Sequence, residues 1–329
     1  MLRKINLKRF PLILIYLLLL VYPFSSLQAI GKWGCLSSGL LEMFVPGLGY
    51  AISGQWDKAA IIGGGKWIAS NHLYNSYNSK DIQLNTDEIY QFTDTDQSKS
   101  GLAETKVYLN KETWKAQFYS NVYSNLLLTT WGDMYQHGCK SNIETYGYML
   151  APLRVDHFYD KWSFWIPIAF AGYLYNELPK YSKIEYHLGN GLKRDELKRE
   201  SFMMYYGVGL GEEMFFRGTV QDAIFYLYKD SFGFSGEFSR HLSVFSASAV
   251  FGAAHNGSGF TANPATAFVF GLYLGYVYHP SLAEFDLTTA IAIHSWWDII
   301  VSFAVLNNAE YFEGDQAVSV PLLNIAFQF

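Results

Sequence analysis

Cysteine and charge are both scarce in this sequence. Only two cysteines, Cys35 and Cys139, occur among the 329 residues, and neither belongs to a CxxC pair. A disulfide framework and a thiolate zinc site are therefore excluded, although one bridge between the two cysteines stays open on the oxidising side of a membrane. Charged residues make up 16% of the chain, below the ~25% of an ordinary soluble domain.

The balance of charge and apolarity argues against nucleic acid as a partner. The formal net charge is -5, so no excess of cations is available to neutralise phosphates. Half of the residues are hydrophobic and 18% are aromatic, which indicates contact with membrane lipid. Lipid offers backbone groups no hydrogen-bond partner, and no alternating barrel pattern is present. We therefore expect an all-α fold, a polytopic bundle of transmembrane helices.

The start of the chain has the form of an export signal. A basic stretch around Arg3 and Arg9 is followed by a short apolar core, by Pro23 and by the small residue Ala29. This order predicts a signal peptide over residues 1–29, with an uncleaved N-terminal anchor as the alternative. Either version leads the chain to the cytoplasmic (inner) membrane, which we expect it to cross several times.

The rest of the chain divides by composition into five segments. We expect an apolar helical hairpin over residues 30–70. A polar, solvated linker is expected over 71–112. The amphipathic, tyrosine-rich segment 113–160 is expected to lie at the membrane interface. The main intramembrane domain is expected over 161–310, and a C-terminal tail over 311–329.

Within the main domain, a charged connector precedes four apolar segments. The connector, 180–200, is expected to be a solvated amphipathic helix on the cytoplasmic side. The apolar segments cover about 202–228, 241–255, 263–279 and 285–306. Ionisable residues interrupt three of them. Because an ionisable group is costly in hydrocarbon, each interruption is a candidate functional site.

The first interruption is Glu212-Glu213-x-x-x-Arg217. Glu213 and Arg217 are four residues apart, one helical turn, so they can form an ion pair. Glu212 points about 100° away from that pair. Alone, the three residues also fit a purely structural ion-pair cluster. The second interruption is His255, four residues after Phe251, and a lone histidine on an apolar helix is more often a core residue than a catalyst.

The third interruption pairs His294 with Asp298, again one turn apart on one helix face. A carboxylate at this spacing can fix the tautomer of the imidazole or share a ligand with it. Alone, it also fits a simple helix-stabilising pair.

In order and spacing, the three interruptions resemble the motifs of the CAAX-protease and bacteriocin-processing family, which includes the type II CAAX prenyl endopeptidases. Those motifs are Glu-Glu-x-x-x-Arg, Phe-x-x-x-His and His-x-x-x-Asn/Asp. The similarity covers roughly residues 160–310 and includes the glycine-bearing segment 270–276. It implies that 161–310 is an intramembrane protease domain that hydrolyses peptide bonds of a membrane-associated protein or peptide. The N-terminal half lies outside the resemblance.

The resemblance also implies a role for each residue of the first two motifs. Glu212 would be the general base that activates a water molecule, and His255 would help to hold that water. Glu213 and Arg217 would support the first helix.

The last motif would stabilise the oxyanion of the tetrahedral intermediate through His294 and residue 298. This sequence has Asp298, where Asn is frequent in the family. An ionised carboxylate offers no hydrogen-bond donor, so Asp298 can orient His294 instead and leave the oxyanion to that histidine.

A metal-dependent mechanism stays open beside the metal-free one. Carboxylate and imidazole groups at Glu212, His255, His294 and Asp298 also suit a catalytic zinc, or another divalent ion, with an open coordination position.

Other mechanisms fit the sequence less well. Neither His-Glu-x-x-His nor Gly-x-Ser-x-Gly occurs, and the rhomboid-like stretch 233–236 lies in a connector. The same buried charges also fit a catalytically inactive membrane scaffold or an ion- or proton-conducting transporter. A conduction path needs polar residues along its length, whereas here they gather at three points, so the sequence favours the enzyme.

Overall fold

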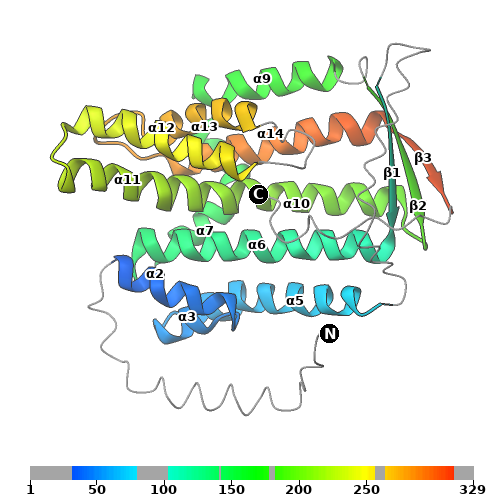
Figure 1. The fold of residues 1–329 in the computed structure, drawn as a ribbon, viewed down its shortest axis with the longest axis horizontal. Coiled ribbons are helices and arrows are strands. Elements are labelled where there is room, and N and C mark those ends of the chain that lie inside the picture. Colours follow the sequence, from blue (N-terminus) through cyan, green and yellow to red (C-terminus); the bar gives the residue numbers. More distant parts are fainter. Residues whose placement is uncertain (1–31, 80–102, 141, 178–181, 256–263, 315–329) are drawn as a thin grey trace.

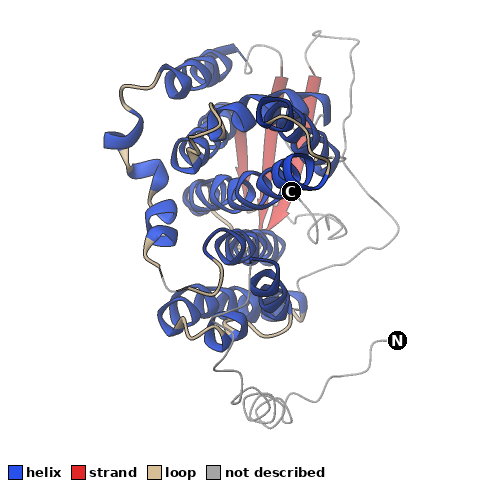
Figure 2. Ribbon diagram, turned by 90° about the vertical axis from the view of Figure 1, so that its left-hand side faces the viewer, coloured by secondary structure: helices blue, strands red, loops and turns tan. Residues whose placement is uncertain are grey.

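The computed structural model describes residues 32–79, 103–140, 142–177, 182–255 and 264–314. Most of these residues are helical, as the sequence predicted. The long helices run along one axis of the molecule, and a small sheet closes one end of the bundle (Figure 1). Figure 2 looks along that axis, with the helices end-on and the strands behind them. The expected signal peptide lies outside the described residues.

Three long helices form the centre of the bundle: α6 (Lys111–His137), α10 (Arg194–Phe215) and α14 (Leu287–Asn308). α10 packs against both α6 and α14. Since α10 carries the two glutamates of the first motif, the position of those glutamates depends on both neighbours.

Side-chain caps fix where two of these helices begin. Asn110 accepts a hydrogen bond from the backbone N–H of Thr113 at the start of α6 (2.7 Å), and Asp286 accepts one from Thr289 at the start of α14 (3.0 Å). Each cap satisfies a backbone donor that the helix itself leaves free, which contributes about 1 kcal/mol.

Glycines allow the central helices to approach closely. A Cβ atom at Gly132 of α6 would overlap the backbone of Met214 in α10, and one at Gly209 of α10 would overlap the backbone of Ser295 in α14. Any larger residue at either glycine would therefore push the helices apart.

Further helices cover the centre. α9 (Trp162–Glu177) packs on α14, and α12 (Gly236–Ala254) pairs with α13 (Pro264–Tyr278). After Phe215 the helix of α10 continues through a π-helical turn, Phe216–Gln221, into α11 (Asp222–Tyr226). These bounds agree with the four predicted apolar segments.

The N-terminal module consists of α2 (Lys32–Leu40), α3 (Leu48–Ile52), α4 (Trp56–Lys58) and α5 (Gly64–Tyr77). The chain turns at Gly54, whose φ of 77° favours glycine. α5 packs along α6. The remaining short helical elements of the described chain are Leu41–Met43, Ala59–Gly63, α7 (Glu144–Met149), Ala151–Leu153, α8 (Val155–Phe158) and Leu227–Ser231.

A disulfide and buried ion pairs hold this module to α6. Cys35 and Cys139 are bonded, which is the pairing that the sequence left open. Lys58 of the module pairs with Asp133 of α6 at 2.8 Å, and both side chains are buried. The hydroxyl of Tyr50 donates to the same carboxylate at 2.9 Å. Removing one partner of such a buried pair typically costs about 3–5 kcal/mol, because the other charge loses its compensation.

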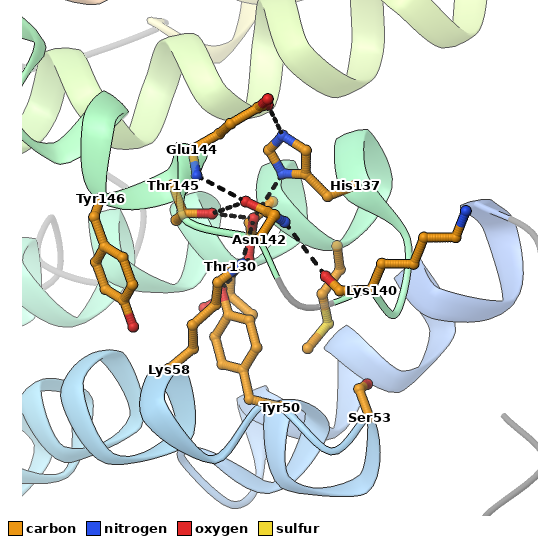
Figure 3. Close-up of polar contacts among 12 residues, drawn as sticks. Tyr50, Ser53, Lys58, Thr130, His137, Lys140, Asn142, Glu144, Thr145 and Tyr146 are labelled. Atoms are coloured by element: carbon orange, nitrogen blue, oxygen red, sulfur yellow. Dashed lines mark hydrogen bonds and ion pairs between the residues drawn. The ribbon is translucent and has the colours of Figure 1, made fainter. Parts of the chain in front are cut away.

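The polar cluster of the module continues to the surface. His137 bonds Asp133 through Nδ1 (2.8 Å) and the more exposed Glu144 through Nε2 (2.7 Å), and Thr145 donates to Asp133 as well. In Figure 3, Lys58 extends from the N-terminal helices towards these groups of α6 and α7. A second buried pair, Lys66 with Glu42, also reaches Thr130 of α6.

The sheet has three parallel strands in the order β1-β2-β3: β1 (Ala103–Asn110), β2 (Ser182–Gly189) and β3 (Glu310–Glu313). β1 leads directly into α6, β2 precedes α10, and β3 follows α14. The sheet therefore lies at one end of the bundle, where α6 and α10 begin and α14 ends.

The fold is mostly helical, and the strands correct the predictions for three segments. The expected linker 71–112 begins with helix to Tyr77 and ends with β1, and the expected amphipathic helix 180–200 contains β2. The expected tail 311–329 begins within β3. The charged residues of 180–200 favoured a solvated helix there, although Ile184, Tyr186 and Leu188 alternate with polar residues as in a strand.

The interfacial position of segment 113–160 stays a prediction. Within the bundle, α6 lies between α5 and α10. Its polar face looked suited to headgroups, but Asp133 and Thr130 are buried there against lysines of the N-terminal module. Periodicity shows that one face of a helix is polar, but tertiary packing determines which groups that face contacts.

Within the described residues, one helix, Leu287–Asn308, is long and apolar enough to cross a membrane, and a shorter apolar helix covers Pro264–Tyr278. Several crossings therefore stay a prediction.

Candidate active site

The structure brings all six motif residues into one region between three segments: α10 with its π-helical continuation, the end of α12, and the middle of α14. These residues are Glu212, Glu213, Arg217, His255, His294 and Asp298. The π-helical turn inserts an extra residue into the helix immediately after the glutamates, and such turns occur frequently at functional sites.

Glu213 is bonded through both of its oxygens. Its Oε2 accepts a hydrogen bond from Nε of Arg217 at 2.9 Å, the pairing that the spacing predicted. Its Oε1 bonds Nδ1 of His294 at 2.8 Å. The carboxylate thus holds two segments together and has little freedom to act on a substrate.

Glu212 is in the opposite situation. It is buried, with 2% of its surface exposed, and its Oε2 has no hydrogen-bond partner among the described residues. That oxygen lies 3.7 Å from Nε2 of His255 and 3.8 Å from Nε2 of His294. These separations exceed a direct hydrogen bond but lie within reach of one bridging water. Glu212 is therefore the carboxylate with free capacity to accept a proton.

The orientation of His255 follows from its backbone contact. Its Nδ1 lies 2.8 Å from the carbonyl oxygen of Phe251, and a carbonyl can only accept, so Nδ1 carries a hydrogen and donates. In the neutral ring, Nε2 is then an acceptor, and it faces Glu212. A water between the two groups can donate one hydrogen to each and keep a lone pair free.

The ring of His294 is fixed by Glu213, through the 2.8 Å bond at Nδ1. Asp298 lies on the other side of the ring, with Oδ2 3.4 Å from Nε2. The sequence offered Asp298 as the group that orients this histidine. The structure supplies a shorter contact from Glu213 instead, which the spacing within α14 did not reveal because Glu213 belongs to another helix.

Aromatic rings line the region. The Phe251 ring centre is 4.3 Å from that of His255, and the Phe270 ring centre is 5.4 Å from that of His294. Phe216 meets Phe251 edge to face at 5.0 Å. Such walls exclude water and strengthen the electrostatic interactions between the enclosed groups. Phe270 had no assigned role, although it begins the glycine-bearing segment of the resemblance.

A contact outside the reaction centre anchors the helix that carries His294. Asp286, just before α14, accepts hydrogen bonds from Lys161 (2.6 Å) and Thr289 and lies 2.9 Å from His157. Burial acts to raise the pKa of Asp286, but the hydrogen bonds from Lys161 and Thr289 outweigh it and hold that pKa below its usual value. The start of α14 is thereby tied to α8 and α9.

The arrangement of ligands gives no support to a metal site. In the part of the chain that the structure describes, no group of three or more His, Cys, Asp or Glu side chains is placed to hold one ion. Metal binding by Glu212, His255, His294 and Asp298 stays a prediction.

Comparison with known proteins gives one match. Residues 200–300 match the model of the family described as Type II CAAX prenyl endopeptidase Rce1-like, and all six motif residues lie in this range. No curated protein and no solved structure matches the chain. Residues 200–300 are therefore similar to a family of membrane-embedded proteases, which supports the resemblance to the CAAX-protease and bacteriocin-processing family that the motifs indicate.

Proposed function

We propose that this protein is an intramembrane endopeptidase that cleaves a membrane-associated protein or peptide with a water molecule activated by Glu212. The observation that supports this best is the buried, unpartnered Oε2 of Glu212, 3.7 Å from Nε2 of His255 and 3.8 Å from Nε2 of His294. A general base needs an acceptor within one water of the scissile bond, and Glu212 provides one.

The reaction is a balanced hydrolysis. A water donating to Glu212 and His255 attacks the carbonyl carbon of the scissile peptide. Its oxygen forms the new C–O bond, Glu212 takes its proton, and the carbonyl electron pair moves onto oxygen. When that pair returns, the C–N bond breaks, and the proton from Glu212 passes to the leaving amine. The products are a carboxylic acid and an amine.

The metal-free form of the mechanism is the one we favour. A metal centre would require the side chains of the second and third motifs to converge on one ion, and the described residues offer no such group of three. A catalytic zinc would instead act by lowering the pKa of its bound water.

A membrane location follows from large apolar side chains on the outer faces of several helices. Trp67 of α5, Phe170 of α9, Phe245 of α12 and Val269 of α13 are each more than half exposed. Exposed apolar area of this extent marks an interaction surface, and lipid on several sides of the bundle accounts for its spread. We therefore propose a multi-pass protein of the cytoplasmic membrane.

The test uses Glu212→Gln in two ways. First, the variant is purified from native membranes, and proteins that co-purify with it but not with wild type are identified as trapped substrates. Second, wild type and variant are reconstituted in lipid nanodiscs with internally quenched peptides from those proteins, anchored by either an acyl or a prenyl chain. Cleavage by wild type and none by Glu212→Gln is expected.

Glu237→Gln is the matched control, because Glu237 lies in the first turn of α12 and its side chain is mostly exposed. This control should cleave like wild type. An inactive scaffold or a transporter predicts no cleavage by any of the three proteins, and equal cleavage by Glu212→Gln would refute the assigned base.

A further inference from the structure

Arg217 uses only part of its hydrogen-bonding capacity. Its side chain is fully buried, and its Nε donates to Glu213 at 2.9 Å, yet Nη1 and Nη2 have no acceptor among the described residues. An arginine usually meets a carboxylate through two parallel bonds. Here the second oxygen of Glu213 is taken by His294, so the pairing is one-sided. The outer edge of the guanidinium is left without a partner.

Arg240 forms a similar pair elsewhere in this chain, with 11% of its side chain exposed, and there the remaining donors are used. Its Nε pairs with Glu237 at 3.0 Å, and its guanidinium lies 5.7 Å from the centre of the Tyr276 ring. Unlike Arg217, it also donates from Nη1 to the carbonyl oxygen of His279 at 3.1 Å. Buried donors need acceptors, so the free edge of Arg217 is a place for an oxygen atom that the folded chain does not supply.

That edge belongs to the reaction centre. The guanidinium carbon of Arg217 is 5.1 Å from the centre of the Phe251 ring, and the same ring lies 4.3 Å from His255 and 5.9 Å from His294. The guanidinium and both imidazoles therefore pack around one aromatic ring, which places Arg217 within the reaction centre.

The proposed hydrolysis requires hydrogen-bond donors such as those of Arg217. Glu212 and Glu213 are buried, Asp298 lies near them with 15% of its side chain exposed, and Arg217 is the permanently charged cation among the six motif residues. An oxyanion that forms here adds negative charge, and the ionised carboxylate of Asp298 cannot donate to it. A guanidinium edge offers several donors and a compensating charge.

We propose that Arg217 is a catalytic residue whose Nη edge binds the carbonyl oxygen of the scissile peptide and stabilises it as the oxyanion. This inference rests on the proposed hydrolysis and changes no bond in it. The electron pair that moves onto oxygen when water attacks is held by Arg217, and it returns when the C–N bond breaks. Residue 298 then has no donor role in this chain.

The first experiment compares Arg217→Lys with wild type and with Arg240→Lys, using the quenched peptide that wild type cleaves in nanodiscs. Lysine can keep the charge and a bond to Glu213, but it lacks the Nη edge. We expect kcat to fall by about 10²–10³-fold with little change in KM, the usual effect of removing an oxyanion donor. Arg240→Lys should retain wild-type kcat.

A second measurement separates transition-state binding from structural support. A peptide phosphonate of the same sequence carries an anionic oxygen where the oxyanion would form. Arg217→Lys should weaken its inhibition by the same factor as kcat, while binding of the uncleaved peptide in a Glu212→Gln background stays unchanged. The double variant Arg217→Lys/Asp298→Asn should recover part of kcat, because an amide at 298 can donate where the carboxylate cannot.

Each result bears on a different claim. If wild type cleaves and Glu212→Gln does not, while Arg217→Lys matches Arg240→Lys or alters only KM, Arg217 is not an oxyanion donor. If Arg217→Lys lowers kcat without weakening the phosphonate, and Asp298→Asn recovers nothing, the residue is structural and the inference fails. If wild type does not cleave, or Glu212→Gln cleaves equally, the proposed function itself fails.

Discussion

The two adjacent glutamates should respond in opposite ways to the same substitution. Glu213 accepts from Arg217 at 2.9 Å and bonds His294 at 2.8 Å, whereas Oε2 of Glu212 has no partner. Glu213→Gln leaves one acceptor oxygen for two donors and removes the charge that compensates the buried Arg217. Breaking a buried charge pair in this way typically costs about 3–5 kcal/mol, so we expect a clear fall in unfolding temperature.

Glu212→Gln should have no such effect on stability. It removes a carboxylate that is buried without a bonded partner, and a neutral amide of the same shape is less costly to bury. Its stability should equal or exceed that of wild type while cleavage is abolished. Glu213→Gln should lower cleavage as well, by about 10–100-fold, because His294 loses the carboxylate that fixes its ring.

The assay measures thermal unfolding and peptide cleavage on the same nanodisc preparations of wild type, Glu212→Gln and Glu213→Gln. Glu237→Gln serves as the control for the Glu-to-Gln change at an exposed site. Equal unfolding temperatures for the Glu212 and Glu213 variants would refute the division of roles between the two residues. So would a Glu212 variant that is markedly less stable than wild type.

Further outcomes are expected from the remaining contacts. Asp298→Asn should retain or raise cleavage, since Glu213 rather than Asp298 fixes His294, and a 10–100-fold loss would instead assign the orienting role to Asp298. Treatment with a chelator should leave cleavage unchanged, and a loss that added zinc reverses would support a metal mechanism. Lys58→Met should destabilise the protein by about 3–5 kcal/mol, measured by calorimetry, because Asp133 keeps a buried charge. The pKa of Asp286 is lowered in the folded state, so the stability that its carboxylate provides is complete at neutral pH. That contribution declines below the unfolded pKa of ~3.9 and is lost below the folded one, so unfolding curves of wild type and Asp286→Asn should converge in acid.

The sequence predicted most of the apolar helices because their signal is local. Runs of apolar residues delimit α12, α13 and α14 closely, and Gly54 marks a turn that the structure has. The spacing of Glu213 and Arg217 also predicted their ion pair, because residues four apart meet on any helix.

What the sequence did not reveal depends on contacts between distant segments. β1 pairs with β2, which lies almost eighty positions later, and neither segment alone indicates this pairing. The bond between Glu213 and His294 joins residues 81 positions apart. In each case the local sequence is compatible with several contact partners, and tertiary packing determines which partner is contacted.

The N-terminal module matters to the chemistry although the family match begins only at residue 200. A side chain on Gly211 would overlap Asn125 of α6, so the helix turn that carries Glu212 lies in direct contact with α6. α6 in turn is held on its other side by the buried pair of Lys58 with Asp133 and by α5. A displacement of the module would be transmitted through α6 to the turn that carries Glu212, the proposed general base. The unit that positions Glu212 therefore extends beyond the matched residues, and the buried charges of the module are part of what holds the reaction centre in place.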